Sequence, residues 1–251
     1  MTGFQTLLYK EVLRFWKVSL QTLLAPLVST LLYLLVFSHV MAGHTDIYPS
    51  ITYAAFLVPG LVMMSMLQNA FANSSSSLVQ SRVTGNLVFL LLTPLTPAEI
   101  FLGYVLASML RGLLVGSVVC LTALSFFSLP FREPLWVAGF ALLATFMSGA
   151  LGVLAGLWAE KFDQMAAWQN FVILPLTFLS GAFYSLHSLP PVWAVVSRFN
   201  PFFYMTDGFR YGFLGHSDVP PLESLTIVAV TCLALSWGTM ALLRCGWRLR
   251  T

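Results

Sequence analysis

Residues able to carry acid–base, nucleophilic or metal chemistry are few in this sequence. The 251 residues include nine Asp and Glu, four His and three Cys, and the cysteines lie far apart, as core-filling residues do. Two histidines and two aspartates lie in one stretch of the chain: His187, His216, Asp207 and Asp218. Their spacing matches no metal-binding or nucleophile–base pattern. The sequence therefore predicts neither a catalytic residue nor a metal site, and it disfavours a membrane enzyme.

Uncharged polar residues interrupt one of the apolar runs: Gln68, Asn69, Asn73 and the serines at 74–77. Inside a membrane protein such residues either line a substrate path or hydrogen-bond neighbouring helices, and the sequence leaves both readings open. Arg111 is the one charge well inside an apolar run, where insertion into lipid would cost about 2.5–3.5 kcal/mol. We expect it to face the protein interior or to extend to the inner interface. These residues form the candidate substrate path.

The amino-acid composition indicates what kind of structure holds these polar groups. Hydrophobic residues make up 58% of the chain and charged residues 8%, against about 25% charged in a soluble domain. Several apolar runs reach the roughly 20 residues that a bilayer-spanning helix needs. Short alternating segments typical of a transmembrane barrel are not evident. The sequence therefore predicts an all-α, polytopic membrane protein.

We expect a single transmembrane domain over residues 1–251. Residues 1–18 form an amphipathic helix with Lys10, Glu11, Arg14 and Lys17 on its polar side, lying in the membrane interface. Residues 244–251 form a cytoplasmic tail, and residues 20–243 hold six spans. These spans are predicted at 20–41, 52–73 (continuing as a more polar helix to about 81), 98–128, 134–158, 166–183 and 222–243. Gly149, Gly152 and Gly156 recur at helical spacing and predict a packing face.

The positions of Lys and Arg predict the orientation. With the N-terminus inside, eight lie on inner segments (Lys10, Arg14, Lys17, Arg82, Lys161, Arg244, Arg248 and Arg250) and three on outer segments (Arg132, Arg198 and Arg210). Positive charge is enriched on the cytoplasmic side of membrane proteins. Both termini are therefore expected in the cytoplasm, which requires an even number of spans.

The segment after the fifth predicted span stays apolar although glycine and proline interrupt it. Pro190 and Pro191 forbid a regular helix, whereas Asn200 and Pro201 are typical of a new helix start. Two short re-entrant helices in the outer leaflet fit this pattern, and an interfacial loop with aromatic anchors is the alternative. Asp207 and Arg210 lie three residues apart and can pair near the outer surface. The candidate outer gate comprises Phe183, Tyr184, Pro190, Pro191, Trp193, Asn200, Pro201, Phe203, Asp207 and Arg210.

Four stretches resemble a known family. They are "FVILPLTFLSGAFYSLHSLPPVW" at 171–193, "NPFFYMTDGFRYGFLG" at 200–215, "FLVPGLVMMSMLQNAFANSSSS" at 56–77 and "GYVLASMLRGLLVG" at 103–116. In their order along the chain they resemble ABC-2 type permeases, the membrane subunits of a class of ABC exporters. The resemblance is greatest to the YadH-like bacterial inner-membrane permeases. The resemblance implies an interfacial N-terminal helix, six spans and re-entrant helices between the last two.

The resemblance also implies partners. It predicts a homodimer of permeases in the bacterial inner membrane, bound to two copies of a separate ATP-binding cassette ATPase that binds ATP and Mg. The chain itself has no G-x-x-x-x-G-K-[ST] phosphate loop, so no cofactor and no ATP hydrolysis are expected here. Membrane lipid is expected around the spans, and no nucleic-acid partner is predicted.

Residues 82–99, "RVTGNLVFLLLTPLTPAE", are the candidate contact with the ATPase. A short helix between Asn86 and Pro94 corresponds, by the resemblance, to a coupling helix that docks in a groove of the ATPase. Relatives often carry acidic residues before the leucine run, where this chain has Val88 and Phe89, so docking is expected to be more apolar. The candidate coupling residues are Arg82, Asn86, Leu87, Phe89, Leu91, Pro94 and Glu99. Residues 159–164 are either a second contact or a solvated turn.

Two transport mechanisms are compatible with the sequence. The resemblance favours an ATP-driven exporter that moves an amphipathic or lipid-like substrate outward through a dimer interface. The alternative is an ion-coupled secondary transporter that works without an ATPase. Such proteins usually need a carboxylate within the membrane, and no acidic residue falls in the middle of a predicted span.

Overall fold

The computed structural model describes residues 3–40, 51–127 and 129–246. All regular elements in these ranges are helical, which confirms the all-α prediction. The helices in chain order are α1 (Gly3–Trp16), α2 (Ser19–Val40), α3 (Tyr53–Val83), α4 (Asn86–Leu92), α5 (Pro97–Phe126), α6 (Pro134–Trp158), α7 (Phe162–Trp168), the π-helical turn η1 (Gln169–Ile173), α8 (Leu174–Phe178), the 3-10 turn η2 (Leu186–Ser188), α9 (Pro191–Arg198), α10 (Pro201–Leu214) and α11 (Pro221–Cys245).

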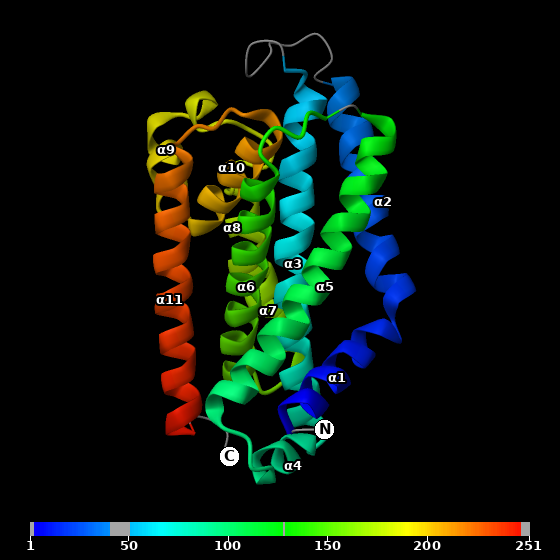
Figure 1. The fold of residues 1–251 in the computed structure, drawn as a ribbon, viewed down its shortest axis with the longest axis vertical. Helices are drawn as coiled ribbons and strands as arrows, with labels where there is room; N and C mark the ends of the chain where they lie inside the picture. Colours follow the sequence, from blue (N-terminus) through cyan, green and yellow to red (C-terminus); the bar gives the residue numbers. More distant parts are fainter. Residues whose placement is uncertain (1–2, 41–50, 128, 247–251) are drawn as a thin grey trace.

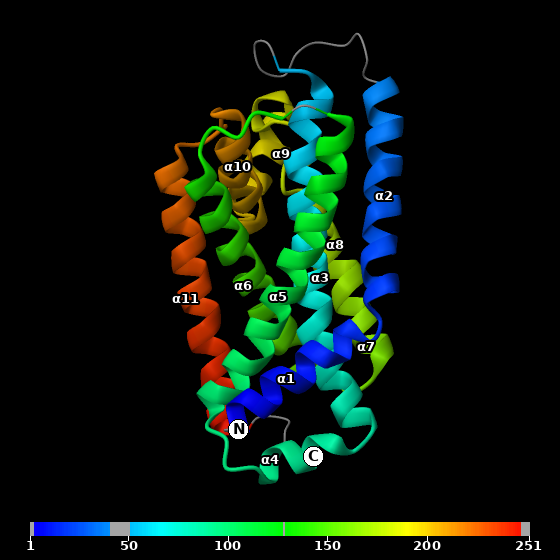
Figure 2. The ribbon, with the colours of Figure 1, turned by 45° about the vertical axis from the view of Figure 1, so that its right-hand side comes forward.

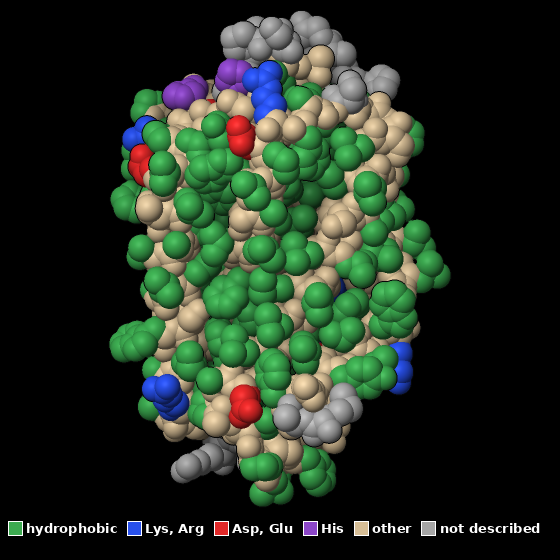
Figure 3. Space-filling model, viewed as in Figure 1, with side chains coloured by type: hydrophobic (Ala, Val, Ile, Leu, Met, Phe, Trp, Pro, Cys, Tyr) green, Lys and Arg blue, Asp and Glu red, His purple; other side chains and the backbone are tan. Residues whose placement is uncertain are grey.

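The long helices run along the longest axis of the molecule, whereas the short helices gather at its ends (Figures 1 and 2). Helices α1 and α4 lie at the lower end, near the last turn of α11, and α9 and α10 lie toward the upper end. On the face in Figure 3, side chains of Lys, Arg, Asp, Glu and His lie near the two ends, and hydrophobic side chains cover the middle. This distribution is that of a protein that crosses a membrane along its long axis.

Within the described ranges, five helices are long and apolar enough to span a bilayer: α2, α3, α5, α6 and α11. The remaining predicted span, 166–183, corresponds to the run α7–η1–α8, which begins earlier, at Phe162, and ends earlier, at Phe178. The π turn interrupts this run, so no single helix there reaches a spanning length. The count of six spans therefore stays a prediction.

Helix α3 forms the centre of the bundle. It is one helix of 31 residues, which joins the predicted second span to its polar extension, and most of it is buried. At a rise of about 1.5 Å per residue it is roughly 46 Å long, longer than a hydrocarbon core of about 30 Å. The polar end of α3 therefore extends past the apolar band toward α4.

Small residues let α6 approach α3 closely. A Cβ atom at Gly152 would lie 2.5 Å from the Phe71 backbone oxygen, and one at Gly156 would lie 2.8 Å from the Leu78 Cβ. Ser74 on α3 also donates a hydrogen bond of 2.8 Å to the Gly149 oxygen on α6. The predicted glycine packing face is thus confirmed, and α3 is its partner.

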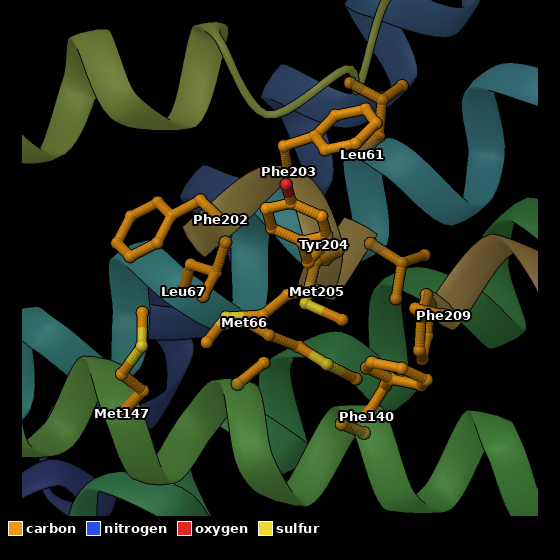
Figure 4. Close-up of a cluster of buried hydrophobic side chains, with 14 of the residues drawn as sticks. Leu61, Met66, Leu67, Phe140, Met147, Phe202, Phe203, Tyr204, Met205 and Phe209 are labelled. Carbon is orange, nitrogen blue, oxygen red and sulfur yellow. The ribbon is translucent and has the colours of Figure 1, made fainter. Parts of the chain in front are cut away.

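Helix α10 is packed inside the protein rather than against lipid. Its side chains join those of α3 and α6 in one hydrophobic cluster, shown in Figure 4: Phe202, Phe203, Tyr204, Met205 and Phe209 of α10 with Leu61, Met66 and Leu67 of α3 and Phe140 and Met147 of α6. This placement satisfies the requirement that non-spanning backbone at membrane depth be shielded by protein.

Helix α1 corrects the sequence prediction in one respect. Glu11, expected on the polar side, is fully buried together with Leu7 and Phe15, which lie four residues before and after it. Its carboxylate contacts Lys10 Nζ at 3.4 Å and Arg14 Nε at 3.3 Å. Arg14 continues to α3, where Nη2 donates to the Asn73 backbone oxygen at 2.6 Å. The helix is therefore docked on the bundle through a charged contact.

We predict that Glu11→Ala destabilises the fold more than Lys10→Ala does. Loss of Glu11 leaves Arg14 in the contact with α3 without its anion, and breaking a buried pair costs about 3 kcal/mol or more. Lys10 is mostly exposed, so its removal should cost about 1 kcal/mol at most. At about 2 °C per kcal/mol, Tm of purified Glu11→Ala should fall by roughly 6 °C. Equal Tm values for the two variants would contradict the buried contact.

Candidate functional site

A cavity of about 570 Å³ lies between α2, α3 and α5, with Arg14 of α1 and Gln169 of η1 also in its wall. Four of the predicted path residues line it: Gln68, Asn69, Ser76 and Arg111. They come from two helices, and the hydrogen bond from Arg111 Nη2 to Asn69 Oδ1, 3.3 Å long, joins them. Thus the structure brings together polar side chains that the sequence placed in separate apolar runs.

Asn69 is held in position from both ends of its carboxamide. Its Nδ2 donates to the Ser65 backbone oxygen one turn earlier, at 3.0 Å, while its Oδ1 accepts from Arg111. The Gln68 Nε2 and Arg111 Nε atoms, in contrast, are buried and make no hydrogen bond within the part of the chain that the structure describes. The cavity wall therefore holds two donors that its own residues do not satisfy.

Asn73 lies in a helix contact rather than on the cavity wall. It is fully buried, its Nδ2 donates to Ser108 Oγ of α5 at 3.4 Å, and its Oδ1 accepts from Arg14 Nη2 at 3.1 Å. Ser75 donates to the Phe71 oxygen of its own helix at 2.8 Å. The polar run of α3 thus has two roles: Gln68 and Asn69 face the cavity, whereas Asn73 and Ser75 make structural hydrogen bonds.

The candidate coupling segment contains the short helix α4. Gly85 precedes it with φ of +75°, a conformation that glycine adopts readily, and the Asn86 side chain donates to Thr84 Oγ1 at 3.0 Å. Leu87 is buried beneath the helix, whereas Val88, Phe89 and Leu92 are 59%, 70% and 76% exposed. The side chain of Leu91 lies outside the described residues, as do residues 247–251 of the predicted tail. An apolar face of α4 is therefore open at the lower end of the molecule (Figure 1).

The other predicted coupling residues have local structural contacts. Arg82 at the end of α3 donates to the Ala159 and Leu157 backbone oxygens at 2.6 and 3.1 Å, so it binds the carboxyl end of α6. Glu99 forms a capping box with Thr96 at the start of α5. Pro94 is exposed between α4 and α5. These contacts fix how α4 is attached to the bundle.

The predicted outer gate divides into a buried helix and an exposed one. Asn200 caps α10, accepting from the Phe202 N–H at 3.0 Å and donating to the Leu176 oxygen at 2.7 Å, and Pro201 begins the helix. Phe203 is fully buried. In α9, which begins at Pro191 after the exposed Pro190, Trp193 is 52% exposed. Phe203, a predicted gate residue, therefore lies inside its own chain, because α10 packs against α3 and α6.

Asp207 and Arg210 do not form the predicted surface pair. Both are fully buried. The Asp207 carboxylate accepts the backbone N–H groups of Asp218 and Val219 at 2.9 and 3.1 Å, so it holds the loop after α10. Arg210 Nη2 donates to the Gly181 oxygen at 2.6 Å, and the guanidinium lies 3.8 Å from the Phe56 ring centroid. The two side chains fasten separate segments to α10.

The remaining gate residues, Phe183 and Tyr184, lie in the segment between α8 and η2. The Phe183 ring contacts Tyr33 of α2 and Phe178 of α8 with centroids 5.6 and 5.7 Å apart. Its backbone oxygen accepts a hydrogen bond from Tyr53 Oη at 2.9 Å. Tyr184 is half-buried. This segment therefore connects the upper halves of α2 and α3 to the segment that holds α9 and α10 (Figure 1).

Arg14 and Gln169 are among the cavity residues that sequence reasoning missed. Arg14 was assigned to the polar face of an interfacial helix, and only its position beside Glu11, which is aligned with Leu7 and Phe15, could have indicated that it faces the protein. Gln169 belongs to η1, and no sequence signal marks that π turn. Both residues enter the site through tertiary packing.

Residues 2–214 match the family described as ABC-2 type transporter. The inner membrane transport permease YadH of Escherichia coli (strain K12) is 38% identical over 246 residues, which cover 96% of this chain and 94% of that protein. Nodulation protein J of Rhizobium leguminosarum bv. trifolii is 26% identical over 91% of this chain and 87% of its own length. With its apolar spanning helices, the chain belongs to the ABC-2 type transporter family and is a membrane permease.

Proposed function

We propose that the chain is the permease subunit of an ATP-driven exporter that moves an amphipathic or lipid-like substrate outward. In this proposal it works as a homodimer in the bacterial inner membrane, with both termini in the cytoplasm and with two copies of a separate ATPase that bind ATP and Mg. The observation that carries the proposal is the cavity between α2, α3 and α5, whose wall combines polar and apolar side chains. Such a mixed wall suits a substrate with a polar head and an apolar tail.

The cavity lining also bears on the ion-coupled alternative. It contains no Asp or Glu, although coupling to protons or cations usually requires a carboxylate within the membrane. The two fully buried acids, Glu11 and Asp207, are engaged in contacts that hold α1 and the loop after α10. Transport by the purified chain alone under an imposed proton gradient would favour the alternative.

The exposed face of α4, formed by Val88, Phe89 and Leu92, is proposed as the ATPase docking surface. It is apolar, it lies at the end of the molecule assigned to the cytoplasm, and its buried residue Leu87 packs in one cluster with Leu7 of α1 and Leu78 of α3. A displacement of α4 would therefore reach α1 and α3, which both contribute residues to the cavity wall.

We predict that Phe89→Asp weakens co-purification of the co-expressed ATPase by about tenfold or more. Burial of a Phe side chain contributes about 1.5–3 kcal/mol, and a buried charge would oppose docking as well. Leu135→Asp is the control, since Leu135 is also exposed but lies at the start of α6, at the opposite end. Normal ATPase recovery with Phe89→Asp, at equal membrane insertion, would place the docking surface elsewhere.

The exposed helix α9 is proposed to meet its counterpart in a second copy at the outer end of the path. Its apolar side chains Val192, Trp193 and Val195 are exposed, which is costly unless lipid or another chain covers them. The buried α10 would hold α9 in place through the hydrogen bond of 2.8 Å from Tyr204 Oη to the Arg198 oxygen.

We predict that a cysteine replacing Trp193, in a chain whose three native cysteines are replaced by serine, forms a disulfide between two copies. Oxidation should stop export and leave ATP binding intact. A cysteine at Phe203 is the control and should not crosslink, because Phe203 is buried within its own chain. Crosslinking at position 203 but not at 193 would show that the hairpin does not meet its partner through α9.

A further inference from the structure

The charges on the cavity wall are all positive. Two arginines line the cavity, Arg14 and Arg111, and no acidic side chain does. Arg14 Nε lies 3.3 Å from the buried carboxylate of Glu11, so its charge is neutralised by a residue that does not line the cavity. Arg111 has no acidic partner within 4 Å among the residues that the structure describes. The charge of Arg111 is therefore the one that the cavity leaves without an anion.

The unsatisfied hydrogen-bonding side-chain atoms of the wall are donors, which also suit an anion. Arg111 Nε and Gln68 Nε2 are donors that are buried and unsatisfied in the described chain. Asn69, next to Gln68 in the sequence, uses its oxygen to hold Arg111 and its nitrogen to bond Ser65. Buried donors are rarely left without a partner, and an anionic acceptor beside a guanidinium makes the strong, charge-assisted kind of hydrogen bond.

Apolar groups lie directly beside these donors. Val18, Pro26, Tyr33, Leu61 and Met64 also line the cavity. Helix α2, which forms one side of it, is exposed along much of its other side, including Leu24, Val28 and Leu32. Its volume of about 570 Å³ is within the range of ligand sites, about 300–1,000 Å³, which accommodates a headgroup and the first part of an acyl chain.

We propose that this cavity binds the anionic headgroup of an amphiphile, a phosphate or a carboxylate, through Arg111 and Gln68, with the apolar chain against α2 and Leu61. The site thus selects the charge of the substrate. This inference rests on the proposed function, because it takes the cavity to be the place where the substrate enters the transport path. Binding itself requires no ATP and no ATPase, so it can be measured separately.

The test is native mass spectrometry of the full-length permease in a neutral maltoside detergent, titrated with single-chain lipids. The probes are lysophosphatidic acid, lysophosphatidylcholine with the same acyl chain, and inorganic phosphate. We expect lysophosphatidic acid to bind at least tenfold more tightly than lysophosphatidylcholine, since only its head is a net anion. Inorganic phosphate should bind far more weakly, because it lacks the chain. Equal binding of the two lipids, or tight binding of phosphate alone, would overturn the proposal.

Variants assign the site within the protein. Arg111→Gln should weaken lysophosphatidic acid binding by about ten- to hundredfold and leave lysophosphatidylcholine binding unchanged. Gln68→Leu, of similar size, should weaken it severalfold, and Arg111→Lys, which keeps the charge, should retain part of the affinity. Arg198→Gln is the matched control: Arg198 is exposed on α9 and does not line the cavity.

Unchanged binding in Arg111→Gln would overturn the assignment of the site. If Arg111→Gln does not fold, the comparison of Gln68→Leu with Arg198→Gln decides the question. Failure of this inference is distinguishable from failure of the proposed function. An ATPase that co-purifies with a permease indifferent to headgroup charge would overturn only the inference. Charge-selective binding by a permease that recruits no ATPase would overturn only the exporter assignment.

Discussion

The polar run of α3 imposes the constraint on which the rest of the structure depends. This helix passes through the middle of an apolar bundle, where a polar side chain without a partner is costly. Ser74 is satisfied by the backbone of α6, Asn73 by Ser108 of α5 and Arg14 of α1. The positions of α1, α5 and α6 are thus fixed by the same few side chains. Where α3 does not find enough partners, around Gln68, the bundle leaves a cavity.

These contacts also connect α4, the proposed docking helix, to the cavity. The end of α3 is tied to the carboxyl end of α6 by Arg82, and α4 follows after a short turn at Gly85. About two and a half turns before Arg82, Arg14 joins α1 to Asn73, and Arg14 itself lines the cavity. A displacement of α4 by an ATPase would therefore act on a packed unit whose other side is the cavity wall. Close packing without voids is what makes such a unit move as one body.

Much of the fold follows from sequence pattern, because long apolar runs and glycine spacing report burial directly. Five of the spans, the close contact of α6 and the start of α10 at Asn200–Pro201 were predictable for this reason. The pattern does not tell which neighbour a face contacts. Glu11 and Arg14 were therefore predicted on the polar side of an interfacial helix, Asp207 and Arg210 were predicted to pair near the outer surface, and Phe203 was predicted in the outer gate. The structure differs because of tertiary packing: α1 packs against α5 and bonds α3 through Arg14, and α10 is enclosed by α3 and α6.

We propose that the cavity beside Gln68 is the inner part of the transport path. The most direct measurement is the reaction of a Gln68→Cys variant, lacking the native cysteines, with a water-soluble thiol reagent in inside-out vesicles that contain the complete transporter. We predict rapid labelling without nucleotide, slower labelling when non-hydrolysable ATP is bound, and protection by an anionic single-chain lipid. Labelling that neither nucleotide nor lipid changes would contradict it.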